Sequence, residues 1–248
     1  MQDNHVTRRE RVMNAIDFKP VDRMPKDLGA MASTSISCFA YPKLRRVLGL
    51  PEQLPRVYDT GQMLALPEVD VLDALDCDVV TIGVDRYTNA FDEPERWFPY
   101  DFNGRLPSLV MDPGSFEVMN DGSIVQNGQS RMVEGSYVFD APHGGQAFDM
   151  TAELPYEDLG QLAANLESSI ITDETVESIG AYCRKVRGKT DRAIMYSGFH
   201  IGLGYRHGIP AWSMMCVSDP DYVKKLHELV SDNAVRNFEK LLPAIAES

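Results

Sequence analysis

The segment 67–83, with the sequence PEVDVLDALDCDVVTIG, decides the fold class. Its proline suits the first turn of a helix, and Val69, Leu72 and Leu75 follow at helical spacing. Residues 78–83 are then nearly continuous in apolar character and rich in β-branched side chains, which is typical of a buried strand. A helix that leads into a buried strand predicts a parallel α/β arrangement.

Other segments repeat these two patterns. Residues 24–28 and 192–197 are expected to form two more parallel strands, so that the segment 78–83 is the second of three. The pair Thr7 and Glu10 has the spacing of a capping box and predicts a helix that ends before Pro20. Further helices are expected at 41–48, 67–75, 156–166, 173–187, 210–217 and from 220 to about 241.

Residues 92 to about 150 differ in character from the segments around them. They contain many prolines and glycines and little helical periodicity. Phe116 and Val118 alternate with polar residues, and the dipeptide at 121–122 is Asp-Gly, a strong hairpin signal. Residues 137–139 are expected to form another strand. We interpret this region as an antiparallel, β-rich excursion inserted in an α/β scaffold.

Composition excludes several classes of partner. The 248 residues carry 24 Lys and Arg against 37 Asp and Glu, a formal net charge of −13, which disfavours nucleic acid and anionic lipid. No apolar run approaches the ~20 residues of a membrane span, and the first residues lack the apolar core of a secretory signal. The four cysteines are widely spaced and form no local zinc motif, as in a cytoplasmic protein with reduced thiols.

Four blocks, in order along the chain, resemble the uroporphyrinogen decarboxylase superfamily. They begin at residues 8, 40, 58 and 194 and have the sequences RRERVMNAIDFKPVDRMP, AYPKLRRVLGL, YDTGQMLALPEVDVLDALDCDVVTI and IMYSGFHIGLGYRHGIPAWSMMCVSDPDYVKKLHELV. The resemblance implies an α/β fold of the (β/α)₈ TIM-barrel type, with the site at the carboxyl ends of the strands. Three strands do not close a barrel. The chain is therefore expected to be the N-terminal two-thirds of a single barrel domain, incomplete at the C-terminus, with 92–150 inserted.

The superfamily has two functional branches. Its decarboxylases clamp the carboxylates of uroporphyrinogen with arginines after the first strand, but residues 28–33 contain no arginine. They also place an aspartate at the end of the second strand, and Asp85 is displaced from that place by about two positions. The resemblance therefore favours the corrinoid-linked methyltransferases, which move a methyl group from a small substrate to a thiol or corrinoid acceptor. The alternatives are a uroporphyrinogen decarboxylase, or a non-catalytic half that needs a partner chain.

Cofactors and partners follow from the same resemblance. The methyltransferases bind zinc through a His-x-Cys pair and a later Cys, and this sequence contains no His-x-Cys. No metal ligand or cofactor is thus expected in this chain, whereas zinc and a corrinoid protein are expected for a full-length methyltransferase. The remaining expected partners are a small-molecule substrate and either a second copy of the chain or a missing C-terminal part.

Six residues near the strand ends are candidates for the site. Asp85, a catalytic candidate, and Arg86, a substrate-binding candidate, follow the second strand. A solvated ion pair in a loop has the same sequence pattern. His200 and Tyr205 follow the third strand as catalytic candidates, and Tyr205 also matches the family.

Two candidates for substrate binding complete this set. His207 lies in the same turn as Tyr205, and Asp27 lies at the end of the first expected strand. A surface histidine that is hydrogen-bonded in a loop is the ordinary alternative for a lone His, and Asp27 can equally cap the turn that follows it.

The expected incompleteness of the barrel predicts the behaviour of the chain in solution. An open parallel sheet leaves an unpaired edge, and each uncovered large apolar side chain forfeits ~1.5–3 kcal/mol. We expect residues 1–248 alone to self-associate or to require a complementary chain. Analytical ultracentrifugation tests this expectation. A monodisperse monomer that melts cooperatively would contradict it.

Overall fold

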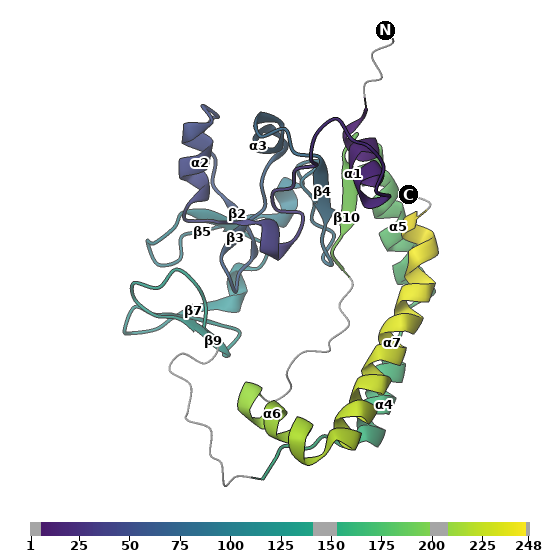
Figure 1. Ribbon diagram of the computed structural model, residues 1–248. Helices are drawn as coiled ribbons and strands as arrows, with labels where there is room; N and C mark the ends of the chain where they lie inside the picture. The colour runs from purple at the N-terminus through teal and green to yellow at the C-terminus, as the bar shows by residue number, and fades with distance from the viewer. Residues whose placement is uncertain (1–5, 141–152, 199–207, 247–248) are drawn as a thin grey trace. The chain divides into compact units, whose positions relative to one another are not determined.

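The computed structural model describes residues 6–140, 153–198 and 208–246 (Figure 1). Contacts divide the chain into two compact units. The first unit comprises Met1–Gly145 and Val186–Gly198, and the second comprises Gln146–Lys185 and Phe199–Ser248. Most of the β-structure expected from the sequence therefore lies in the first unit, and the long C-terminal helix lies in the second.

The expected (β/α)₈ barrel, complete or partial, is wrong. The described residues form separate sheets of five, two and three strands, and none of these sheets closes. Residues 24–28 form no strand. Pro25 has no N–H to donate, and the N–H of Lys26 donates to the Asp78 carboxylate at 2.8 Å instead of to a neighbouring strand. The first of the three strands that suggested a barrel is therefore absent.

The other two expected strands are confirmed, and they pair in parallel. Strand β4 (Val79–Ile82) lies beside β10 (Ala193–Tyr196), with Val79 opposite Ala193 and Ile82 opposite Tyr196. Helix α3 (Val69–Ala74) leads into β4, as expected. Helix α1 (Arg8–Ile16) contacts both strands of the pair, which are seen edge-on beside it in Figure 1.

Antiparallel pairing dominates the rest of the first unit. The five-stranded sheet has the order β1-β3-β2-β6-β5, and only β2 and β6 are parallel within it. Its strands are β1 (Ile36–Ser37), β2 (Arg56–Asp59), β3 (Leu64–Ala65), β5 (Phe98–Tyr100) and β6 (Ser108–Val110). Along the chain, the 3₁₀ turn η1 (Ala32–Thr34) precedes β1, helix α2 (Tyr41–Val47) lies between β1 and β2, η2 (Pro94–Arg96) precedes β5, and η3 (Pro113–Ser115) follows β6.

The expected hairpin forms within a three-stranded sheet, β7-β8-β9. Strands β7 (Phe116–Val118) and β8 (Ile124–Gln126) flank the Asp-Gly turn, and β9 (Ser130–Met132) follows. The strand expected at 137–139 is absent, because Phe139 donates its N–H to Gly61 in a loop. A buried aromatic cluster packs this sheet onto the five-stranded one, with members Tyr100, Phe102, Phe116 and Phe139.

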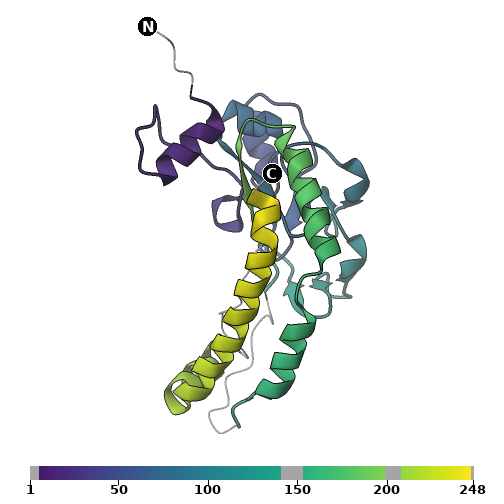
Figure 2. The same cartoon turned by 90° about the vertical axis from the view of Figure 1, so that its right-hand side faces the viewer.

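The second unit is helical. Its elements are α4 (Leu159–Ser168), α5 (Asp173–Arg187, whose last two residues belong to the first unit), α6 (Ile209–Ser218) and α7 (Pro220–Ala246). Helices α4 and α6 both contact α7, the long helix of Figure 2. Trp212, Met215 and Leu226 lie at the centre of its apolar core. None of the helices in the described residues is long and apolar enough to cross a membrane.

A buried carboxylate joins α1 to the start of β4. Asp78 is fully buried and accepts hydrogen bonds from Arg11 at 2.6 Å, from Arg23 at 2.6 and 2.9 Å, and from the Lys26 N–H. Arg11 also donates to both oxygens of Asp22, at 2.6 and 2.7 Å. Burial opposes the ionisation of Asp78, but the bonds from Arg23, Lys26 and Arg11 outweigh it and hold the pKa of the carboxyl below its ordinary value.

Replacing this carboxylate is expected to destabilise the first unit strongly. Asp78→Asn removes the buried anion that Arg11 and Arg23 share and leaves them only the more exposed Asp22 and Asp76, and breaking a buried pair costs about 3–5 kcal/mol. Asp76→Asn is the matched control, because the Asp76 side chain is 51% exposed and pairs with the same Arg23. We expect the control to cost at most ~1 kcal/mol in urea unfolding. Equal losses in the two variants would contradict the central role of Asp78.

The same network predicts a loss of stability in acid. Arg11 holds the pKa of Asp22 at about 2, and the pKa of Asp78 is also lowered. Because both values lie below those of an unfolded chain, ~3.9, the stabilisation is complete above about pH 4 and is lost as the pH falls through the folded values. Urea midpoints measured between pH 6 and pH 2 should show this decline. Its slope should be shallower in Asp78→Asn.

Candidate functional site

The carboxyl edge of the parallel pair β4–β10 is the candidate site, because α/β proteins bind ligands where parallel strands end. Gly83 follows β4, and Ser197 and Gly198 follow β10. A Cβ on Gly83 would lie 2.0 Å from Cζ of Tyr87, so only glycine lets that ring lie over the backbone. The chain thus reverses after β4 and places an aromatic ring at the strand end.

A second tyrosine from the five-stranded sheet meets this ring. Tyr58 lies on β2, and the ring centroids of Tyr58 and Tyr87 are 5.2 Å apart, with the planes inclined by 45°. The Tyr58 hydroxyl is buried and has no hydrogen-bond partner among the described residues. Because an unsatisfied buried hydroxyl costs about 1–3 kcal/mol, this atom calls for a polar group that is not yet in place.

Carboxylates surround the two hydroxyls. Burial raises the pKa of Tyr87 to about 12, and Tyr58, Asp59 and Asp85 act in the same direction, whereas a hydrogen bond with Ser197 opposes them. Burial likewise raises the pKa of Tyr58, and Asp59 and Asp27 act in the same direction; the nearby Ser35 hydroxyl opposes them, although its geometry is not that of a hydrogen bond. Both phenols therefore stay protonated at neutral pH and can serve as neutral hydrogen-bond donors.

Asp27 caps a turn, which was the structural alternative to its predicted role in substrate binding. Its carboxylate accepts from the Thr34 hydroxyl at 2.5 Å and from the Ala30 N–H at 3.2 Å, and so caps the turn that enters η1. Burial raises the pKa of this carboxyl, although the two hydrogen bonds oppose the change. Asp27 nevertheless lies close enough to Tyr58 for its charge to act on that hydroxyl.

Asp85 and Arg86 lie in the exposed turn after β4. Arg96 donates to both of their carbonyl oxygens and fixes the turn, in which Arg86 has a φ of 57°. The Asp85 side chain is exposed and influences the site through its charge on Tyr87. The structure thus places Asp27 and Asp85 around one tyrosine pair. His200, Tyr205 and His207 lie outside the described residues.

Sequence reasoning missed Tyr58, Asp59 and Tyr87. Residues 56–59 have the sequence RVYD, a short alternation of polar and apolar side chains that is compatible with a half-buried strand. That signal could have marked β2 and placed Tyr58 and Asp59 on a sheet. The position of Tyr87 follows from the turn after Gly83, which periodicity does not describe.

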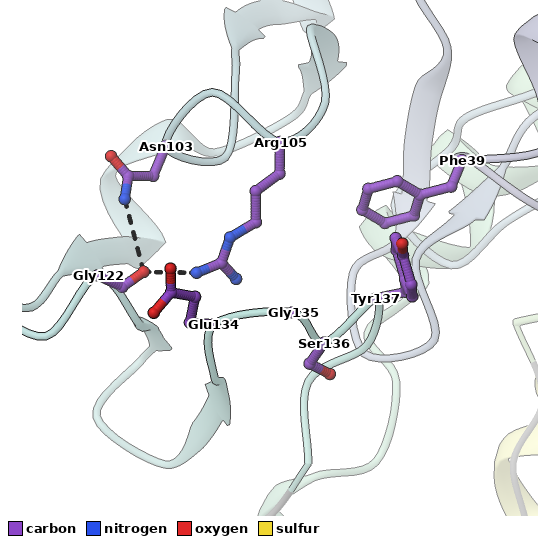
Figure 3. A pocket seen from close by; sticks show the side chains of 8 residues that line it. All are labelled: Phe39, Asn103, Arg105, Gly122, Glu134, Gly135, Ser136 and Tyr137. Atoms are coloured by element: carbon purple, nitrogen blue, oxygen red, sulfur yellow. Dashed lines mark hydrogen bonds between the residues drawn. The ribbon is translucent and has the colours of Figure 1, made fainter.

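A separate cavity of about 400 Å³ lies beside the three-stranded sheet (Figure 3). Arg105 extends into it and donates to the carbonyl oxygens of Gly122 and Val133, while Phe39 and Tyr137 form its aromatic wall with ring centroids 4.8 Å apart. The guanidinium thus ties the β7–β8 turn to the end of β9. We assign this cavity a structural role, because the polar group that dominates it is already used by the backbone.

The described residues do not fit a zinc centre. In the parts of the chain that the structure covers, no three His, Cys, Asp or Glu side chains converge as metal ligands. All four cysteines are free thiols, and the three in the core, Cys38, Cys77 and Cys183, have pKa values that burial raises. Burial therefore disfavours the thiolate form that would bind a metal at those three positions.

Comparison with known proteins adds no relative. No protein-family model matches the chain, and neither a curated protein nor a solved structure matches it at a significant level. The likeness to the uroporphyrinogen decarboxylase superfamily therefore rests on the ordered sequence blocks alone and stays a hypothesis.

Titration of Asp27 tests the geometry of the site. Its carboxyl should titrate above the ordinary value of ~3.9, because burial disfavours the anion. Thr34→Val removes a donor to that anion and should raise the pKa further. Asp121, which is exposed and bonded to Ser123, should titrate below the ordinary value in the same carboxyl ¹³C NMR experiment. An ordinary pKa for Asp27 would contradict its burial.

Proposed function

We propose that the carboxyl edge of β4 and β10 binds a small neutral or cationic methylated substrate, and that the protein takes part in methyl transfer of the corrinoid-linked type to a thiol or corrinoid acceptor. The observation that carries the proposal is the sign of the charge at this edge. The ionised groups that act on the two tyrosine hydroxyls are Asp27, Asp59 and Asp85.

This charge disfavours the decarboxylase alternative. A porphyrinogen carries several carboxylates, and its recognition calls for guanidinium groups that can pair with them. Residues 28–33, where such arginines would follow the first strand, supply none. Asp59 is held in place, since its carboxylate accepts from the Gln62 N–H at 2.9 Å. The carboxylates of Asp27, Asp59 and Asp85 outnumber the two guanidinium groups of the turn, Arg86 and Arg96, so a polycarboxylate would meet net negative charge at this edge.

Each residue at the edge has a role that its surroundings support. The Tyr58 hydroxyl, which lacks a partner, donates to a polar atom of the substrate. The ring of Tyr87 packs beside it, and two aromatic faces give a methylated cation a favourable surface. Asp59 and Asp85 balance the charge of a quaternary ammonium or sulfonium group. These residues bind and orient the substrate, and no metal-dependent step is assigned to them.

Calorimetric titration of the 248-residue chain tests this function. Tetramethylammonium serves as the methylated cation and coproporphyrinogen, kept reduced, as the polycarboxylate. We expect measurable binding of the cation and no sub-micromolar binding of the porphyrinogen. Tyr58→Leu, which removes an aromatic face, and Asp59→Asn should each weaken binding of the cation about threefold to tenfold, or ~0.7–1.4 kcal/mol. Glu117→Gln, which removes an exposed charge on β7, is the control and should bind normally.

Two results would overturn the proposal. Tight binding of coproporphyrinogen would restore the decarboxylase alternative. Failure of the cation to bind, while the chain folds and associates with a second chain, would favour the non-catalytic half.

A further inference from the structure

A second cavity lies against the five-stranded sheet, where Arg56 of β2 and Leu109 of β6 line it. It has a volume of about 540 Å³ and is distinct from the tyrosine pair. Its walls are mostly apolar and are formed by Leu54, Pro94, Trp97, Pro99 and Leu109. The charged groups that line it are Arg56, Glu68, Asp92 and Glu93. One guanidinium and three carboxylates thus meet an apolar, partly aromatic enclosure.

Arg56 is buried and lies beside two carboxylates, but its Nε donates no hydrogen bond among the described residues. The residue is 5% exposed, and its guanidinium carbon lies 5.6 Å from the centroid of the Trp97 ring. Its nearest charged neighbours are Glu68, 3.3 Å from Nε, and Asp92, 3.4 Å from a terminal nitrogen. Nε is buried without a hydrogen-bond partner among the described residues. A guanidinium has five N–H donors, so a buried one in this state is primed for an acceptor.

Glu68 is held by other groups at one of its two oxygens, and only the second, Oε1, lies near Arg56. Its Oε2 accepts from the Tyr41 hydroxyl and from Arg45 at 3.0 Å. Arg45 is in turn fixed by two bonds to Asp70, at 2.9 and 2.8 Å. Glu68 thus belongs to a closed buried network, and its contact with Arg56 lacks the alignment of a hydrogen bond.

Asp92 is placed differently. Its side chain is 82% exposed and reaches Arg56 from the rim of the cavity. Such a carboxylate is well hydrated and can leave Arg56 when a better acceptor enters. Asp92 would then be a negative group at the entrance of the cavity, opposite the positively charged Arg56 at its base.

We propose that this cavity binds a free α-amino acid with an apolar or aromatic side chain. The α-carboxylate accepts the paired N–H groups of Arg56, which match its planar geometry. The α-ammonium lies toward Asp92, which its release from Arg56 makes available. The side chain packs against Trp97, Pro99 and Leu109. The inference concerns a site separate from the tyrosine pair and does not depend on the proposed function.

Trp97 provides a direct reporter of binding. The chain contains two tryptophans, and the other, Trp212, lies in the core of the helical unit, so Trp212→Phe leaves Trp97 as the only indole. L-Leucine titrated into this variant should change the Trp97 fluorescence saturably. Isoamylamine, which lacks the carboxylate, and N-acetyl-leucine, which lacks the ammonium, should each bind at least about tenfold more weakly. Calorimetry on the unaltered chain checks the same ligand series.

Variants of Arg56 and Asp92 test the role of each charge in binding. Arg56→Lys keeps the charge but loses the paired donors, and should weaken binding of leucine about tenfold or more. Asp92→Asn should weaken leucine but leave N-acetyl-leucine unaffected, because the acetyl compound has no ammonium to pair. Glu95→Gln, an exposed neighbour on η2 that does not line the cavity, is the matched control and should bind normally. Circular dichroism establishes whether the buried Arg56 variant folds.

Three outcomes would overturn the proposal. The first is the absence of any fluorescence change or heat with leucine, phenylalanine and methionine up to about 10 mM, which would mean that the cavity holds only water. The second is equal affinity for leucine and isoamylamine, which needs no variant and decides the matter even if Arg56→Lys does not fold. The third is unchanged binding in Asp92→Asn.

Discussion

The buried carboxylate of Asp78 is the contact on which the first unit depends. It lies at the start of β4 and holds Arg11 of α1 and Arg23 of the following loop at once. Because a buried carboxylate needs paired donors, and Arg11 and Arg23 supply them, α1 and the loop must close on the same strand. The position of β4, and with it the position of its carboxyl edge, follows from that closure.

Part of the fold was predictable from the sequence, because it depends on local hydrogen bonds or on continuous apolar segments. The capping box of Thr7 and Glu10 forms as expected, because it requires only local bonds, at 2.8 and 3.2 Å. Strands β4 and β10 were also predictable, since continuous apolar character marks a buried parallel strand. Residues 24–28 lack that continuity, since Pro25, Lys26 and Asp27 interrupt the apolar pattern, and they form no strand because the Asp78 side chain takes the N–H that a ladder would need.

Most of the five-stranded sheet could not be predicted, for a different reason. Strands β1 and β3 are two residues long, which is too short to show a period, and β2 pairs with β6 across about 50 residues of intervening sequence. The candidate site was hard to predict for the same reason. Asp27 and Asp85 were found because they flank strand-like segments, whereas Tyr58 reaches the edge only through the pairing of β2. Long-range pairing therefore determines which side chains meet at the site.

The tyrosine pair at the carboxyl edge of β4 and β10 is the site that we propose for a small methylated ligand. Ring-selective labelling of tyrosine tests it most directly, because NMR then reports on each phenol while tetramethylammonium is added. The account predicts that the ring signals of Tyr58 and Tyr87 shift together and saturate, while those of Tyr100 in the aromatic cluster and Tyr222 on α7 stay in place. Unmoved Tyr58 and Tyr87 signals, or equal shifts at Tyr100 and Tyr222, would contradict it.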